Sequence, residues 1–259
     1  ILALLRTGRH DEASRELDDL FSYKFNIADR AWPEIKAAFP EKFEQHYILN
    51  TMKPEVGIEG GGRRAWVRPA DVIDEDQLTA ALAGAGAETP PASILVTAAG
   101  TNIAGPAAAY RTEDWDLLMD LNGRGTFVAC REFGRRLLER RAPGRIVTIS
   151  SQMGVVGYPG RAAYCATKHA VNGLTKALAV EWAPHGIAVN AVAPTFARTP
   201  MTERMFEDGE FLAEVLRRIP AGELTTVEEV AAAVVYLASD AAQSVTGHVL
   251  AVDGGWTAW

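Results

Sequence analysis

The sequence predicts an α/β protein with a doubly wound, mostly parallel sheet, preceded by an atypical helical segment. Two observations support this fold class: short apolar segments alternate with helical patterns from about residue 65 onward, and these segments are apolar on both faces. Strands of a parallel sheet that is covered by helices on both sides have this pattern. The length of 259 residues, with 48% hydrophobic residues, suits one such domain or one domain with a small appendage.

The alternation predicts the order of strands and helices along the chain. We expect strands at residues 65–68, 93–97, 145–150, 187–192 and 248–252, and helices at 76–83, 112–141, 161–184 and 227–238. The long helix at 112–141 should break near Gly123, because asparagine and glycine are poor helix formers. Thr225 and Thr226, with Glu228 and Glu229 three residues on, have the spacing of a capping box, which marks the start of the last helix.

The first 55 residues do not follow this alternation. Helical patterns cover residues 4–21, 27–38 and 41–52, and a run of three glycines follows at 60–62. We therefore expect a helical segment over residues 1–55, which could replace the first βαβ unit, and a main domain over 56–259. Loss of a central strand would expose its neighbours' edges, so we also expect residues 1–5 or 47–50 to add a strand. The helical segment is either a hairpin packed on the sheet or a partner-binding module.

The composition argues against several classes of function. A formal net charge of −7 disfavours nucleic-acid binding, and no apolar run approaches the ~18 residues that a membrane span needs. Two cysteines, Cys130 and Cys165, cannot form a disulfide framework and suit a reducing cytoplasm. The five histidines show no metal-ligand spacing, so we expect no metal site.

Tyr164 and Lys168 are four residues apart on a predicted helix and therefore share one face. A free tyrosine titrates at about 10, and a neighbouring ammonium group favours the phenolate and lowers that pKa. Such a phenol can exchange a proton with an alcohol or a carbonyl near neutral pH. The alternative for this pair alone is a surface tyrosine that happens to lie beside a surface lysine.

Ser151 directly follows the strand expected at 145–150, thirteen residues before Tyr164. Ligands of open α/β sheets bind at the carboxyl ends of the strands, where a serine hydroxyl can hold a substrate oxygen. The alternative is that Ser151 only ends the strand and caps a turn. Asn122 lies at the expected helix break, which could free a backbone carbonyl to hold a water next to Lys168 as part of a proton relay. The alternative for Asn122 is that it only breaks the helix and has no part in a proton relay.

Several motifs occur in a fixed order: Ala70-Asp71-Val72, Ala98-Ala99-Gly100, Asn122-Gly123, Ile149-Ser150-Ser151, Tyr164-Cys165-Ala166-Thr167-Lys168, Asn190-Ala191-Val192-Ala193-Pro194, Thr199-Pro200-Met201 and Val252-Asp253-Gly254-Gly255. Through these motifs residues 65–259 resemble the short-chain dehydrogenase/reductase family. The resemblance implies a Rossmann-like fold and a homo-oligomer, either a tetramer or a dimer.

The resemblance also implies roles for individual residues. The catalytic tetrad would be Asn122, Ser151, Tyr164 and Lys168, and the cofactor would be NAD or NADP, without a preference between them. The residues expected to bind the cofactor are Asp71 and Val72 at the adenine, Ala98, Ala99 and Gly100 along its length, Tyr164 and Lys168 at the ribose, and Pro194, Phe196 and Thr199 at the nicotinamide carboxamide. Residues 197–220 would form the substrate lid.

The sequence departs from the family pattern in the phosphate-binding loop. The family's Thr-Gly-x-x-x-Gly-x-Gly, which lets the backbone approach the pyrophosphate, has no counterpart here. Two smaller departures are Thr97-Ala98 in place of two asparagines and Thr195 in place of a glycine.

Two functions are therefore open. The first is an NAD(P)-dependent oxidoreductase that interconverts a secondary alcohol and a ketone. Its small-molecule substrate would be a sugar, polyol or sugar acid, because the C-terminal residues 253–259 resemble those of sugar and polyol dehydrogenases. The second is a dehydrogenase-like regulatory or binding protein with impaired or absent dinucleotide binding.

Overall fold

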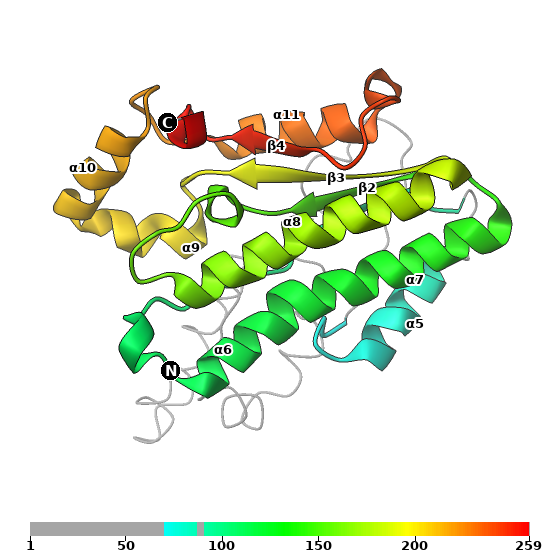
Figure 1. Cartoon of the computed structure of the whole chain (residues 1–259), viewed down its shortest axis with the longest axis horizontal. Coiled ribbons are helices and arrows are strands. Elements are labelled where there is room, and N and C mark those ends of the chain that lie inside the picture. The colour runs from blue at the N-terminus through cyan, green and yellow to red at the C-terminus, as the bar shows by residue number, and fades with distance from the viewer. Residues whose placement is uncertain (1–69, 87–90, 259) are drawn as a thin grey trace, which may run out of the picture.

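The structure, a computed structural model, describes residues 70–86 and 91–258. Within these residues four parallel strands form one sheet in the order β1-β2-β3-β4 (Figure 1). The strands are β1 Ile94–Thr97, β2 Gly144–Ile149, β3 Ile187–Pro194 and β4 Val249–Val252. The four predicted strands from residue 93 onward are thus confirmed to within two residues, as is the parallel α/β fold class. The strand expected at 65–68, the helices and added strand expected in residues 1–55, and the 55–62 boundary lie outside the described residues.

Helices cover both faces of the sheet. The α-helices are α5 Glu75–Gly86, α6 Thr112–Leu118, α7 Gly125–Arg140, α8 Ala162–Trp182, α9 Pro200–Glu203, α10 Gly209–Arg218 and α11 Val227–Ala238. Short 3₁₀ turns are η1 Ala107–Ala109, η3 Gln152–Gly154, η4 Ala183–His185, η5 Arg204–Glu207, η6 Asp240–Ala242 and η7 Trp256–Ala258. Figure 1 shows α7 and α8 side by side on one face of the sheet and α11 on the other.

Alternate residues of the strands bury apolar side chains on opposite faces of the sheet. In β2, Ile146 packs in the core shared with α7 and α8, whereas Val147 packs in the core that contains Leu237 of α11. Both strand residues are fully buried. This two-sided burial explains why the strands are apolar on both faces in the sequence.

Near Gly123, where a break was predicted, the α-helix is irregular and takes the form of a widened helical turn. The π-helical segment η2, Met119–Arg124, joins α6 to α7 without interrupting the helix. The backbone N–H of Gly125 bonds the carbonyl of Asp120, five residues earlier. Such π turns occur frequently at functional sites. The turn holds Asn122, which is almost completely buried.

The predicted start of the last helix is also marked by observed hydrogen bonds. The capping box of α11 is present, because Thr226 N–H donates to Glu229 Oε2 at 2.8 Å and Glu229 N–H donates to Thr226 Oγ1 at 3.2 Å. Among the described helices none is long and apolar enough to cross a membrane.

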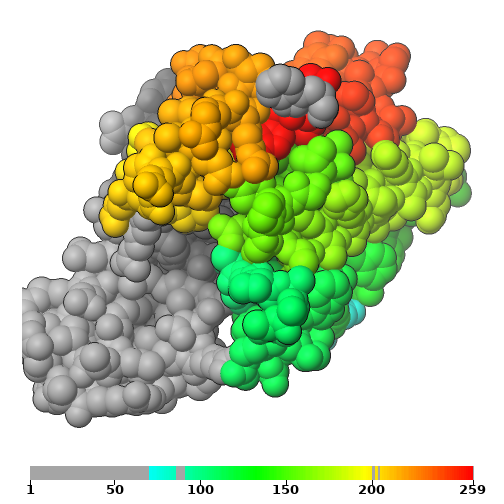
Figure 2. Space-filling view, turned by 60° about the vertical axis from the view of Figure 1, so that its left-hand side comes forward, coloured from blue at the N-terminus to red at the C-terminus, as the bar shows by residue number. Residues whose placement is uncertain are grey.

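The predicted lid, residues 197–220, folds into α9, η5 and α10 near the carboxyl end of the sheet. Figure 2 shows this segment, coloured yellow to orange, against the red C-terminal residues. An aromatic cluster under the lid joins Phe206 and Phe211 to Phe196, Tyr158 and Trp256, with ring centroids 5.7 to 6.4 Å apart. The lid is therefore anchored on the C-terminal segment by aromatic packing.

Asp253 fixes the turn that carries Trp256 into this cluster. Its carboxylate accepts hydrogen bonds from Gly255 N–H, Thr257 N–H and the Thr257 hydroxyl at 2.6 to 3.0 Å. Gly254 has φ +56°, and a Cβ there would lie 2.5 Å from a methyl group of Ile219. The Asp-Gly-Gly motif is thus a structural turn that seats the C-terminus against the lid.

Candidate active site

Ser151 lies just past the carboxyl end of β2, as expected. Its hydroxyl accepts a hydrogen bond from Met153 N–H at 3.1 Å and so caps η3. The same hydroxyl interacts with the phenol of Tyr164, which lowers the pKa of that phenol. The turn cap is therefore confirmed, and the role of Ser151 at a substrate site stays a prediction that its contact with Tyr164 is consistent with.

Tyr164 and Lys168 lie on one face of α8, as their spacing predicts. The ammonium of Lys168 sits 5.5 Å from the centroid of the Tyr164 ring. It donates to the backbone carbonyl of Ile149 at 2.9 Å, and Lys168 is only 5% exposed. The end of β2 thus orients the lysine beside the tyrosine, a contact that connects residues nineteen positions apart.

Asn122 is tied to the loop that follows β1. Its Oδ1 accepts from Thr101 N–H at 2.8 Å, and its Nδ2 donates to the Thr101 carbonyl at 2.8 Å and to Thr167 Oγ1 at 3.1 Å. Its own backbone carbonyl accepts from the Thr126 hydroxyl at 2.7 Å. The carbonyl that we expected to be freed by the helix break is therefore already engaged, and the side chain makes the long-range connections. Thr101 and Thr126 belong to none of the sequence motifs, and Thr167 lies within the motif from Tyr164 to Lys168 without a predicted role of its own.

Burial sets the protonation of the site. It raises the pKa of Tyr164 to about 12, although Ser151 and Arg161 act in the opposite direction. It lowers the pKa of Lys168 from 10.5 to about 8, because the ammonium has little access to water. We expected Lys168 to bring the phenol pKa below its ordinary value; in this structure desolvation of the phenol dominates instead.

The loop after β1 passes close to these side chains. A Cβ at Gly100 would lie 3.1 Å from Asn122 Oδ1 and 3.6 Å from Lys168 Nζ. Ala98 and Ala99 precede it directly after β1. The predicted lining of the cofactor thus runs beside two of the catalytic candidates, and a glycine at position 100 allows the close approach.

Asp71 and Val72 lie just before α5. The Asp71 carboxylate accepts from Ile73 N–H at 2.9 Å, and the Val72 carbonyl would be 3.0 Å from a Cβ at Gly125. Val72 therefore lies against the start of α7, and Asp71 caps the adjacent turn. Their contact with adenine stays a prediction.

Pro194, Phe196 and Thr199 lead from the end of β3 into the lid. Phe196 is 8% exposed because its ring belongs to the aromatic cluster under the lid. The Thr199 hydroxyl lies 3.2 Å from that of Thr202. The place of these residues fits the expected nicotinamide contact, which stays a prediction.

The two smaller departures from the family pattern leave unsatisfied hydroxyls. Within the described residues, Thr97 Oγ1 and Thr195 Oγ1 are buried and have no hydrogen-bond partner. Asparagine and glycine are the family's residues at these places, so the substitutions carry a local cost that nothing in the structure explains.

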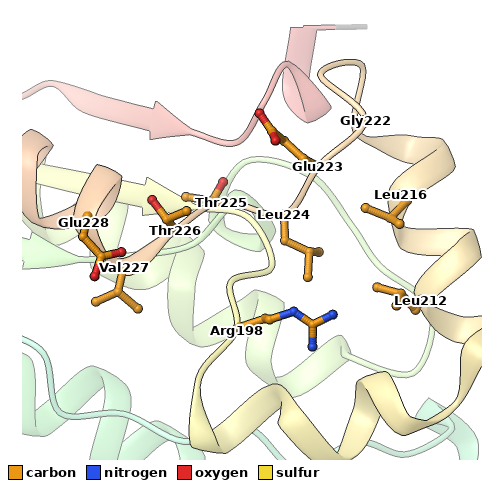
Figure 3. A pocket seen from close by; sticks show the side chains of 10 residues that line it. All are labelled: Arg198, Leu212, Leu216, Gly222, Glu223, Leu224, Thr225, Thr226, Val227 and Glu228. Carbon is orange, nitrogen blue, oxygen red and sulfur yellow. The ribbon is translucent and has the colours of Figure 1, made fainter.

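A separate pocket of about 560 Å³ lies between the lid and the start of α11. Figure 3 shows Arg198 extending between Leu212 and Leu224 into this space. Its remaining lining residues are Leu216, Gly222, Glu223, Thr225, Thr226, Val227 and Glu228. No predicted catalytic residue lines it. In the part of the chain that the structure describes, no cluster of His, Cys, Asp and Glu could hold a metal ion.

Known proteins with similar sequences and structures cover most of this chain. A family model described as enoyl-(acyl carrier protein) reductase matches residues 52–257. Gluconate 5-dehydrogenase of Gluconobacter oxydans (strain 621H) is 38% identical over 201 residues, which are 78% of this chain and 78% of that protein. Galactitol 2-dehydrogenase (L-tagatose-forming) of Cereibacter sphaeroides is 46% identical over 194 residues, which are 73% of this chain and 75% of that protein.

A solved structure agrees with these relatives. The crystal structure of a gluconate 5-dehydrogenase from Burkholderia cenocepacia J2315, in complex with NADP and tartrate, has a TM-score of 0.71 and 34% identity. The similarity covers 74% of this chain and 75% of that chain. The family match begins at residue 52, so the N-terminal segment lies largely outside it, as the motifs predicted. This chain belongs to the short-chain dehydrogenase/reductase family, which uses NAD(P), and its named relatives include dehydrogenases that act on CH–OH groups.

Proposed function

We propose that this chain interconverts a secondary alcohol and a ketone on a sugar, polyol or sugar acid, with NAD or NADP as the redox partner. The observation that carries the proposal is the cluster at the carboxyl end of the sheet. Tyr164, Ser151 and Lys168 meet there, and Asn122 fastens the neighbouring loop through Thr101. Proton transfer at an alcohol oxygen needs such a combination of an acid/base group, a hydrogen-bonding hydroxyl and a cation.

In alcohol oxidation Tyr164 accepts the hydroxyl proton, and in ketone reduction it returns a proton to the carbonyl oxygen. Ser151 hydrogen-bonds the same oxygen and holds it beside the phenol. The Lys168 ammonium stabilises the phenolate that forms when Tyr164 has lost its proton. Asn122 keeps the loop after β1 in place next to Lys168.

The described residues fit the nicotinamide half of a dinucleotide. An ammonium group has three N–H donors, and Lys168 uses one of them on Ile149 within the described residues, which leaves donors for ribose hydroxyls. Gly100 leaves open the space beside Lys168 that a Cβ would fill. Lys168 and Tyr164 would hold the ribose, and the bound nicotinamide would supply the hydride acceptor or donor.

The names of the relatives support the substrate class. One acts on gluconate, a sugar acid, another on galactitol, a polyol, and the solved structure contains tartrate, a hydroxy acid. Dimers and tetramers are common in the family, which supports a homodimer or homotetramer for this protein. Measuring the mass of the protein in solution would test this expectation.

Isothermal titration of the full chain with NAD⁺, NADH, NADP⁺ and NADPH tests the proposal directly. We expect micromolar binding of at least one of the four. Binding of none would refute it and favour a dehydrogenase-like regulatory or binding protein, the function that the missing glycine loop suggests.

A further inference from the structure

Arg161 is a charged residue in an unusual position. It is 8% exposed, and within the described residues no carboxylate forms an ion pair with it. Its Nε is buried without a hydrogen-bond partner, and its NH1 reaches only the adjacent Gly160 carbonyl, at 3.5 Å. Buried charges in proteins are paired, because an unpaired charge loses its hydration without compensation. Among the residues that the structure describes, the guanidinium therefore lacks an anion.

The position of Arg161 is next to the proposed site. It is the residue that precedes α8, and Cys165 N–H bonds its carbonyl at 2.8 Å, so Arg161 and Tyr164 are three residues apart around the first helical turn. Arg161 is the N-cap residue of α8, one helical turn before Tyr164. Burial raises the pKa of the Tyr164 phenol, and the positive charge of Arg161 acts in the opposite direction.

Tyr158 supplies a second polar group without a partner. The Arg161 N–H bonds the Tyr158 carbonyl at 3.3 Å, which connects the two residues through a tight turn. The Tyr158 hydroxyl is buried and has no partner among the described residues. Its ring lies 5.7 Å from Phe196 and 6.0 Å from Trp256, beneath the lid. Burial and the Glu214 carboxylate raise the pKa of this phenol, while Arg218, whose guanidinium lies 5.3 Å from the ring centroid, and Arg161 act in the opposite direction.

We propose that Arg161, assisted by the Tyr158 hydroxyl, binds the carboxylate of the substrate, so that the enzyme prefers sugar acids to neutral polyols. This inference rests on the proposed function. The planar guanidinium fork matches the two oxygens of a carboxylate, and a phenol donates one further hydrogen bond. The carboxylate would supply the anion that the buried guanidinium lacks, while Tyr164 acts on a hydroxyl further along the same molecule.

Matched pairs of substrates test this inference. An aldonate and the alditol of the same configuration, such as D-gluconate and D-glucitol, differ only in whether C1 is a carboxylate or an alcohol. We would measure kcat/KM for pairs of four to six carbons with NAD⁺ and with NADP⁺, and the corresponding keto compounds in reduction. We expect the acid of a pair to be favoured, and Arg161→Gln to lower the acid-to-alditol ratio roughly 10- to 100-fold. Any effect of Arg161 on Tyr164 itself cancels in this ratio.

Two tyrosine variants keep the test informative if Arg161→Gln folds poorly. Tyr158→Phe removes only the unpartnered hydroxyl, and we expect it to lower the ratio severalfold. Tyr110→Phe is the matched control, because the Tyr110 hydroxyl already donates to the Ile103 carbonyl at 2.9 Å. It should leave the ratio unchanged. Calorimetric titration with the aldonate gives a readout that does not depend on turnover, and Arg161→Gln should weaken that binding.

The outcomes separate the two proposals. If alditols are oxidised as well as aldonates, and Arg161→Gln leaves the ratio unchanged, the carboxylate site is refuted while the oxidoreductase function stands. A preference for a phosphorylated alditol over the aldonate would likewise overturn the carboxylate assignment. If no member of any pair reacts in either direction, the proposed substrate class itself fails.

Discussion

Replacing Asn122 by leucine would test whether its side chain holds the loop after β1 against the site. Leucine has a similar size but cannot form the hydrogen bonds to Thr101 N–H and to the Thr101 carbonyl, both 2.8 Å long. Thr101 is 5% exposed, so both backbone groups would be left buried and unpaired. Each such group costs about 1–3 kcal/mol, and two give a loss of about 4 kcal/mol in the free energy of unfolding. Thr167 would keep its bond to the Tyr164 carbonyl, so it adds little to this sum.

Chemical denaturation monitored by circular dichroism measures this loss. In a chain of this size the same change lowers the melting temperature by roughly 10 °C. Asn102→Leu is the matched control, since Asn102 Oδ1 has no partner within the described residues, and we expect it to be close to neutral. A free energy of unfolding for Asn122→Leu within about 1 kcal/mol of the unchanged protein would refute the reasoning, because two orphaned groups must cost more than that.

Three other changes have expected outcomes. Tyr164→Phe removes the acid/base hydroxyl and should lower kcat by about 10² to 10⁴ at unchanged circular dichroism; an active variant would contradict the assignment. Lys168 has a pKa of about 8 in the folded protein and an ordinary pKa of 10.5. Between these pH values the unfolded chain holds a proton that the folded chain has released, so the free energy of unfolding should rise by about 3 kcal/mol as the pH increases from 8 to 10.5. The free energy of unfolding, measured by denaturation at pH 7 to 9.5, should therefore increase with pH more steeply for the unchanged protein than for Lys168→Met. Above pH 10 the raised pKa of Tyr164 lowers the free energy of unfolding as the pH increases. Gly134→Ala would place a Cβ 2.5 Å from the Trp182 ring and should destabilise the protein by about 1–3 kcal/mol in thermal melts, and a melting temperature equal to that of the parent would show that the ring moves aside freely.

The elements were predictable from the sequence to the extent that their signals are local. The strand expected at 145–150 is β2 at Gly144–Ile149, since a short apolar run with a polar boundary needs no distant information. The strand expected at 187–192 extends to Pro194, because pairing with β4 continues the ladder beyond the apolar run. The helix irregularity near Gly123 was predictable from propensity, but its π geometry was not, because that depends on the packing of the helix against the neighbouring loop.

The candidate site was predictable as residue types and was not predictable as contacts. The spacing of Tyr164 and Lys168 determines that they share a helix face. That the Lys168 ammonium bonds the Ile149 carbonyl, or that Asn122 bonds Thr101, follows only when segments nineteen and twenty-one residues apart are brought together. The sequence also gave no sign that burial would raise the pKa of Tyr164, since desolvation depends on everything that covers the ring.

The sequence by itself determined the parallel α/β sheet and the capped start of the last helix, because periodicity and capping act over a few residues. The four catalytic candidates were identified through the resemblance of their motifs to the family. Tertiary structure alone decided which backbone groups hold Asn122 and Lys168, and how burial shifts the pKa values of Tyr164 and Lys168. It alone also decided that Arg161 is buried without an anionic partner among the described residues. These properties depend on which surfaces exclude water, and that exclusion is created only when distant segments pack together.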